Sequence, residues 1–188
     1  MKKLLLLLLF HVSLNARAQI NKTQEPFAHT FSMVARDSRT GEMAVIVQSH
    51  WFSVGSLVSW GEAGVGVVAT QSFINKSFGI RGLELLKQGK SPQQALDLLL
   101  RDDPGREYRQ VAMVDIQGRV AVFTGKSCIA EASHLTGDGF SAQANMMLNN
   151  KVVPAMEKAW LENGNLSLAE RMITSFCLNF EPQSKTRD

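Results

Sequence analysis

Short apolar runs separated by turn-forming residues characterise the chain from residue 30 onward. Residues 30–37 (TFSMVARD) and 43–49 (MAVIVQS) have the pattern of strands, and the segment between them contains Gly41, which can adopt a positive φ. This pattern predicts a β-hairpin. Residues 64–72 (GVGVVATQS) predict a further buried strand, and the glycine-rich stretch 61–66 that overlaps its start predicts a turn.

Apolar positions then recur at helical spacing. Leucine and isoleucine side chains three positions apart predict a helix over residues 78–88 that ends before Gly89. A second helix is predicted to begin at Ser91, because Pro92 suits the first helical position and Gln94 completes a capping box.

The second half of the chain repeats the order of strands followed by helices. Residues 110–115 and 119–124 predict another hairpin, residues 151–163 predict a helix, and Ser167-x-x-Glu170 forms a capping box that starts a last helix. Strands, helices, strands and helices in this order favour a layered α+β domain, predicted over residues 30–180, with a polar tail at 181–188.

The first 18 residues, MKKLLLLLLFHVSLNARA, have the features of a cleaved export signal. Two lysines precede an apolar core of seven residues, and Ala16-Arg17-Ala18 fits the small-x-small cleavage rule. The apolar core is too short to span a bilayer, which takes about 20 residues. We therefore expect an exported protein, periplasmic or extracellular, in which a polar lead-in segment, residues 19–29, precedes the domain.

Charge and composition narrow the function classes. The 188-residue chain carries 20 basic and 17 acidic residues, and three of the basic ones lie in the predicted signal, so the remaining 170 residues have a net charge of zero. With no basic surface expected, we predict no nucleic-acid partner, and with no second long apolar run we predict no membrane span after signal removal. The histidines and cysteines are too scattered to predict a metal site, and no cofactor motif is present.

The two cysteines, Cys128 and Cys177, leave two alternatives open. In an oxidising compartment they could form a disulfide, which the chain-entropy model values at roughly 3–4 kcal/mol. They could equally be two separate thiols.

A hydroxyl residue that opens the first strand, after a removable lead-in, suits an N-terminal nucleophile. In such an enzyme the first residue supplies both the attacking side chain and a free α-amine, whose pKa of roughly 7.7–8.0 lets it act as a general base near neutral pH. Thr30 is the candidate, and Ser32, two residues later on the same face of the strand, is a weaker one. Threonine is also simply a good strand former, so the pattern leaves a structural role open.

Several motifs, in order, resemble one bacterial family. TFS-x-VARD, VATQ, DDPGREYRQV and FTG lie between Thr30 and Trp160, and together they resemble the family known as domain of unknown function 1028 (DUF1028). The resemblance implies an N-terminal-nucleophile (Ntn) hydrolase fold, an αββα sandwich, with Thr30 as nucleophile. It also implies a cleft lined by polar motif residues, for which the candidates are Gln71, Asn75, Arg109, Gln110, Thr124 and Asn145.

The chain departs from the family pattern in four respects. Eleven residues separate the predicted signal from Thr30, so a second cut at His29-Thr30 is needed to free the amine. The family's Gly-Asn pair is Ala144-Asn145 here, and its Trp-Ala-Gly segment is replaced at residues 131–133. The family's closing strand has no counterpart, which predicts a C-terminally truncated sandwich with an exposed sheet edge and makes a homo-oligomer conceivable. No lysine follows the second strand, as one does in proteasome-type sites.

The leading hypothesis is therefore an exported hydrolase that cleaves an amide bond of an unidentified small molecule or peptide. A non-catalytic binding module of the cell envelope, or a truncated inactive family member, is the alternative.

Overall fold

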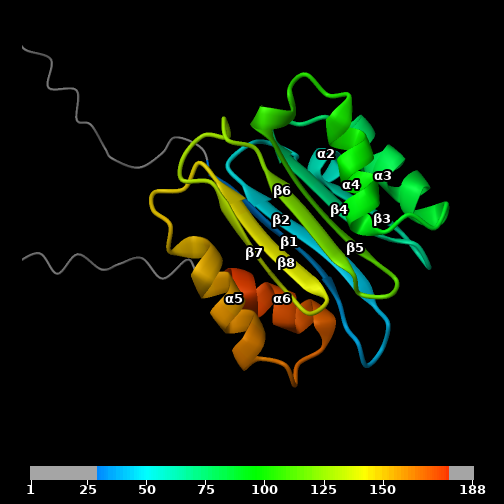
Figure 1. The fold of residues 1–188 in the computed structure, drawn as a ribbon. Coiled ribbons are helices and arrows are strands. Elements are labelled where there is room, and N and C mark those ends of the chain that lie inside the picture. Colours follow the sequence, from blue (N-terminus) through cyan, green and yellow to red (C-terminus); the bar gives the residue numbers. More distant parts are fainter. Residues whose placement is uncertain (1–28, 178–188) are drawn as a thin grey trace, which may run out of the picture.

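The computed structural model describes residues 29–177, which form two four-stranded antiparallel sheets that pack face to face (Figure 1). One sheet has the strand order β2-β1-β8-β7 and the other the order β3-β4-β5-β6. The strands are β1 (Thr30–Arg36), β2 (Met43–Ser49), β3 (Ser59–Glu62), β4 (Gly66–Ser72), β5 (Arg109–Asp115), β6 (Val120–Thr124), β7 (Ser133–Gly137) and β8 (Phe140–Asn145).

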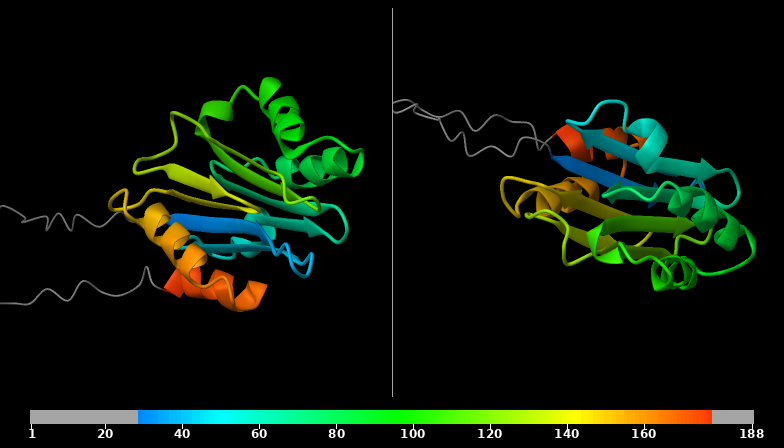
Figure 2. Two further views of the ribbon diagram at one scale, coloured as in Figure 1. Left: turned by 60° about the horizontal axis from the view of Figure 1, so that its bottom comes forward. Right: turned by 90° about the horizontal axis from the view of Figure 1, so that it is seen from above.

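Helices cover the outer face of each sheet, so the described residues form four layers, helix–sheet–sheet–helix (Figure 2). Helices α3 and α4 pack on one sheet and α5 and α6 on the other, whereas α2 and the 3-10 helix η1 lie in connections. Their bounds are α2 (Gly55–Val58), α3 (Ser77–Lys87), α4 (Pro92–Arg101), η1 (Arg106–Tyr108), α5 (Val152–Glu162) and α6 (Leu168–Cys177).

The first hairpin forms as the sequence predicts. β1 pairs with β2 from Thr30↔Ser49 to Arg36↔Met43, and Gly41 in the turn has φ +78°. Asp37 closes the turn, because its carboxylate accepts hydrogen bonds from the Arg39 side chain at 2.7 Å and from the Arg39 backbone N–H at 2.8 Å. These bonds lower the pKa of Asp37 to about 2.

The predicted helix starts are also confirmed. Ser91 Oγ accepts from the Gln94 backbone N–H at 3.2 Å, and the Gln94 side chain accepts from the Ser91 N–H at 2.9 Å, which is the predicted capping box. Ser167 and Glu170 form a similar pair before α6, with 2.6 Å between Ser167 Oγ and the Glu170 carboxylate.

Three strands were not predicted. Residues 61–66 do not form a turn throughout, because Gly61 and Glu62 belong to β3 and the turn is confined to the residues after them, with Gly64 at φ +74°. The hairpin of β7 and β8 was missed entirely, although residues 140–145 (FSAQAN) alternate between apolar and polar side chains as a strand requires.

Three apolar clusters separate the layers. Trp160, Met156 and Phe140 lie between the first sheet and helices α5 and α6, with the Phe140 and Trp160 rings 5.3 Å apart. The cluster under α3 and α4 contains the buried side chains of Leu96 and Phe78. The third cluster fills part of the space between the two sheets and consists of Val34, Val58, Val67, Ala69, Ala112 and Val114.

Two further expectations concern the disulfide and membrane-spanning segments. The disulfide alternative is not realised within the described residues, because Cys128 and Cys177 are both free thiols, one half-buried and the other exposed. Among residues 29–177 no helix is long and apolar enough to cross a membrane. The predicted signal, residues 1–18, most of the lead-in segment and the polar tail lie outside the described residues.

Candidate functional site

The space between the two sheets becomes polar at the end where β1 begins. Alternation along each strand places Gln71 of β4, Gln110 of β5 and Asn145 of β8 on the inner faces, beyond the last inner valines and alanines. The three residues are 1%, 0% and 0% exposed. A cluster of carboxamides buried to this degree is costly unless its members are hydrogen-bonded, so its bonding pattern is informative.

Gln110 is the centre of this amide cluster. Its Oε1 accepts from Gln71 Nε2 at 2.6 Å and from Asn145 Nδ2 at 3.0 Å. Its Nε2 lies 3.0 Å from the Ala144 carbonyl oxygen and 3.2 Å from that of Ser133, and it donates to Thr124 Oγ1 at 2.8 Å. The cluster therefore joins β4 and β5 of one sheet to β7 and β8 of the other.

Thr30 lies at the same end of the inner layer. It is the first residue of β1, is 4% exposed, and has Asn145 and Ser49 as its register partners on the two neighbouring strands. The Thr30 and Ser49 hydroxyl oxygens are 2.7 Å apart, within hydrogen-bond distance. The candidate nucleophile thus stands directly beside the amide cluster and has a second hydroxyl as its partner.

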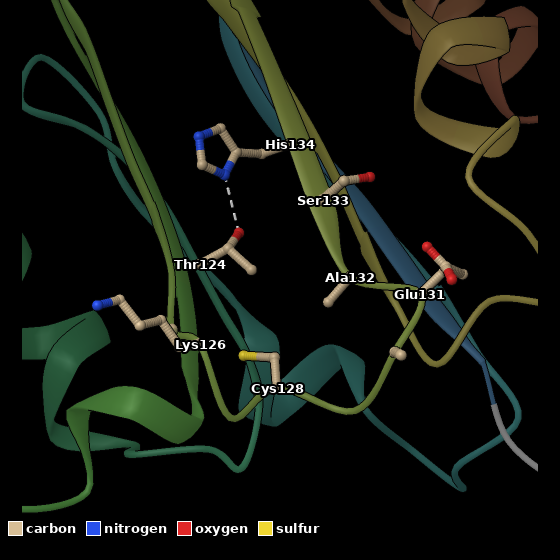
Figure 3. Close-up of a pocket in the computed structure, with 9 residues that line it drawn as sticks. Thr124, Lys126, Cys128, Glu131, Ala132, Ser133 and His134 are labelled. Carbon is tan, nitrogen blue, oxygen red and sulfur yellow. Dashed lines mark hydrogen bonds between the residues drawn. The ribbon is translucent and has the colours of Figure 1, made fainter.

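A groove of about 490 Å³ opens beside the cluster, between β6 and β7 (Figure 3). Thr124 and His134 point toward each other across it, with 2.8 Å between Thr124 Oγ1 and His134 Nδ1. Thr124 and Ser133, which both line the groove, are also hydrogen-bond partners of Gln110. Two residues of the groove wall therefore contact the amide cluster, whose three members are buried behind them.

The Thr124 hydroxyl connects His134 to the amide cluster. Thr124 Oγ1 accepts from Gln110 Nε2 and is within hydrogen-bond distance of His134 Nδ1. Partial burial lowers the pKa of His134, which favours the neutral form of the ring.

A second set of polar side chains lies deeper in the same layer. Gln143 Nε2 donates to Ser32 Oγ at 2.7 Å, and Ser141 Oγ donates to Gln143 Oε1 at 2.8 Å. All three residues are 0% exposed. Ser32 thus shares the inner face of β1 with Thr30, as predicted, but its hydroxyl is held in this separate cluster.

Two of the predicted cleft residues lie elsewhere. Asn75 precedes α3, and its side-chain oxygen accepts from the Ser77 backbone N–H at 3.2 Å and from the Ser77 hydroxyl at 2.8 Å. Arg109 follows the opposite strand alternation to Gln110 and forms an ion pair with Asp103 at 2.7 Å, which lowers the pKa of Asp103. Both have structural partners that hold connecting segments, outside the amide cluster.

No spacing in the sequence selects Ser49 or His134, which the structure brings to the site. Only the register between β1 and β2 places Ser49 opposite Thr30, and only the packing of the sheets places His134 opposite Thr124. Within the part of the chain that the structure describes, no group of three or more His, Cys, Asp or Glu residues is placed to hold a metal ion.

These features define a layered helix–sheet–sheet–helix protein with a hydroxyl-bearing strand start beside a buried amide cluster. The sequence profile of a family of unknown function, DUF1028, matches residues 30–178, and the chain belongs to this family. No curated protein matches the chain.

A solved structure supports the family assignment. The chain is similar to the crystal structure of protein SPO2555 from Silicibacter pomeroyi, of the same family, with a TM-score of 0.76 and 29% sequence identity. The match covers 79% of this chain and 66% of the other, so this chain spans about two thirds of that protein's length.

Proposed function

We propose that this protein is an exported hydrolase of the N-terminal-nucleophile type that cleaves an amide bond, with Thr30 as its nucleophile. The observation that carries the proposal is the position of Thr30: it opens β1, faces the inner layer, and lies against Ser49 on one side and the amide cluster on the other. Export is supported by the composition of residues 1–18.

The proposed reaction uses few groups. Thr30 Oγ1 attacks the substrate carbonyl carbon while its proton passes to the α-amine of the same residue. The carbon–nitrogen bond then breaks, the departing amine takes that proton, and water hydrolyses the resulting ester. Backbone N–H groups at the strand ends would stabilise the oxyanion. Ser49, 2.7 Å from the nucleophile, is placed to orient the hydroxyl.

The mechanism requires that Thr30 become the first residue. The intact mass of the full chain, secreted from a bacterial host, measures this directly. We expect a mass that begins at Thr30; a protein that begins at Gln19 and is never cut further would overturn the mechanism.

Activity is measured on the same preparation with a panel of amino-acid p-nitroanilides and N-acyl amides. Thr30→Ala should reduce turnover to the background rate, whereas Thr30→Ser should retain part of it, because only the second variant keeps a hydroxyl nucleophile. Equal turnover in wild type and Thr30→Ala would refute the assignment of Thr30.

A binding module of the cell envelope is the second candidate. It is favoured by exposed aromatic side chains in the connections around the same end of the sheets: Trp51, Phe52, Phe73 and Tyr108 are 63%, 96%, 56% and 48% exposed. Exposed aromatic residues of this kind are typical of binding surfaces. A secreted protein that begins at Gln19 and binds apolar peptides without hydrolysing them would favour this function.

A further inference from the structure

The amide cluster contains two hydrogen-bond acceptors without partners. Among residues 29–177, four buried side-chain polar atoms lack a partner, and two of them are Gln71 Oε1 and Asn145 Oδ1. A buried acceptor without a partner destabilises the folded state, because it has lost its hydrogen bonds to water without replacement. The deeper cluster of Ser32, Ser141 and Gln143 has no such atom, so unpaired oxygens are a property of this position and not of the inner layer in general.

The orientation of these amides is fixed by the backbone. Gln110 Nε2 faces the carbonyl oxygens of Ala144 and Ser133, which can only accept, so the nitrogen of Gln110 must point there. Gln110 Oε1 consequently faces Gln71 and Asn145, and both must present their nitrogens to it. Rotating either amide to pair its oxygen would place two oxygens against each other. The unpaired oxygens follow from the fold and require a donor from outside the cluster.

The backbone nitrogen of Thr30 points toward β8 in the plane of its sheet, next to the amide cluster. Successive residues of β1 direct their backbone groups alternately to β2 and to β8. The His29 carbonyl accepts from His50 N–H at 3.2 Å on the β2 side, and Arg36 N–H donates to Gly139 O at 2.8 Å on the β8 side. Thr30 has the same parity as Arg36, so its nitrogen points toward β8, where its register partner is Asn145.

We propose that Gln71 and Asn145 form an amine-binding site, in which their unpaired carbonyl oxygens accept the N–H hydrogens of a primary amine. One source of that amine is Thr30 itself, and this source rests on the proposed function: cutting the His29–Thr30 bond converts one N–H directed at β8 into an amine with additional hydrogens. The other source is a small amine ligand bound to the uncut chain.

The amine site gives the α-amine a defined role. Hydrogen bonds to Asn145 and Gln71 would hold the hydrogens of the amine, so that its lone pair is left to face the Thr30 hydroxyl when the amine is neutral. Gln71 and Asn145 would then be positioning residues, which act on the substrate only through Thr30.

The test begins with the secreted full chain and its intact mass, which separates cut from uncut protein. For uncut protein, the melting temperature is measured in methylammonium chloride and in equimolar tetramethylammonium chloride, which has the same charge but no N–H. We expect a saturable rise of about 2–4 °C at roughly five times Kd in methylammonium only. Identical melting curves in the two salts would overturn the amine site, whatever the outcome for hydrolysis.

For cut protein, the site is already filled by Thr30, and methylammonium should have no specific effect on the melting temperature. The readout is then the rate at which cyanate modifies the Thr30 α-amine at pH 7, followed by mass. Asn145→Leu or Gln71→Met removes an acceptor and destabilises the protonated amine, which lowers the pKa of the amine. Because cyanate reacts with the neutral amine, the rate should rise about tenfold for each unit by which the pKa falls, as long as most of the amine is protonated at pH 7. An unchanged rate in both variants would overturn the proposal and leave the Thr30 mechanism standing.

Thr70→Val is the matched control for both measurements. Thr70 neighbours Gln71 on β4, is 0% exposed and also has an unpaired oxygen, but it lies on the other face of the strand, toward the layer of α3 and α4. The variant therefore removes an equally buried unpaired atom outside the amine site. It should respond to methylammonium, or react with cyanate, as the wild type does; a change equal to that of Asn145→Leu would show a general effect of packing and refute the site.

Discussion

Two clusters of buried carboxamide and hydroxyl groups lie in the same layer between the sheets, and they differ in how they are bonded. In the Gln143 cluster both ends of the amide are paired, with Ser32 and Ser141. In the Gln110 cluster both the oxygen and the nitrogen of the central amide are hydrogen-bonded, whereas Gln71 and Asn145 each keep an unpaired oxygen. Burial is nearly equal in the two clusters, so they differ in how completely their polar atoms are paired and not in how polar they are.

The contrast has a physical basis in where the clusters lie. The Gln143 cluster connects β1 and β8 within one sheet, and every partner it needs is on these two strands. The Gln110 cluster lies beside the first residue of β1, where the chain either enters from His29 or, after a cut, begins. At the second position the proposed cut would leave a free α-amine, a group that the uncut sheets do not contain.

The largest expected effect comes from removing the centre of the open cluster. Gln110→Met keeps the shape of the side chain but leaves the side-chain nitrogens of Gln71 and Asn145 buried without their acceptor. The free energy of unfolding should fall by about 3–5 kcal/mol, measured by urea denaturation. A loss below about 1 kcal/mol would mean that Gln110 does not organise the cluster.

The closed cluster should matter for stability alone. Gln143→Met deprives the Ser32 and Ser141 hydroxyls of their partner, so we expect a loss of about 2–3 kcal/mol in urea denaturation. Turnover per folded molecule should equal that of the wild type. If turnover falls along with stability, the two clusters act as one unit and the comparison fails.

Asn145→Leu should show the opposite behaviour. The variant removes a donor to Gln110 Oε1 but also removes an unpaired buried oxygen, and Gln71 still donates to Gln110. These effects offset, so stability should change by no more than about 1 kcal/mol, while turnover is lost. Turnover equal to that of the wild type would place Asn145 outside the working site.

The smallest expected effect concerns His134 and acid. Burial lowers the pKa of His134 below its ordinary value of 6.5, so the unfolded chain takes up a proton first as the pH falls. The contribution of His134 to stability is therefore complete above pH 6.5 and is lost as the pH falls below that value. His134→Gln, which retains an acceptor for Thr124, should lose less stability than the wild type between pH 7.5 and pH 5, as followed by thermal unfolding. Parallel curves would show that the ring is solvated in both states.

The sequence predicted those elements that are marked by residues only a few positions apart along the chain. The hairpin of β1 and β2 was predicted because Gly41 marks its turn, and α4 because Ser91, Pro92 and Gln94 mark its start. The hairpin of β7 and β8 was missed, although Phe140, Ala142 and Ala144 alternate with polar residues. The inner face of β8 is entirely polar, so it lacks the apolar run by which the other strands were recognised.

The candidate site was predicted in part. Gln71, Gln110, Thr124 and Asn145 were expected to share a cleft with Thr30 on the strength of family motifs, and the structure brings these four into one hydrogen-bonded cluster beside Thr30. Asn75 and Arg109 come from the same motifs, but their side chains hold connections instead. Motif membership does not reveal the face of the strand, and for Arg109 and Gln110 a single position along β5 separates the two outcomes.

By itself, the sequence determined the local elements, the helix caps and the membership of the DUF1028 family, because these depend on residues a few positions apart or on an ordered set of motifs. The tertiary structure alone decided which polar groups meet. Gln71 and Gln110 are 39 positions apart, and Gln110 and Asn145 are 35 apart, so their contact depends on how the strands align and the two sheets pack. The two unpaired oxygens exist only because that packing directs both nitrogens to one acceptor.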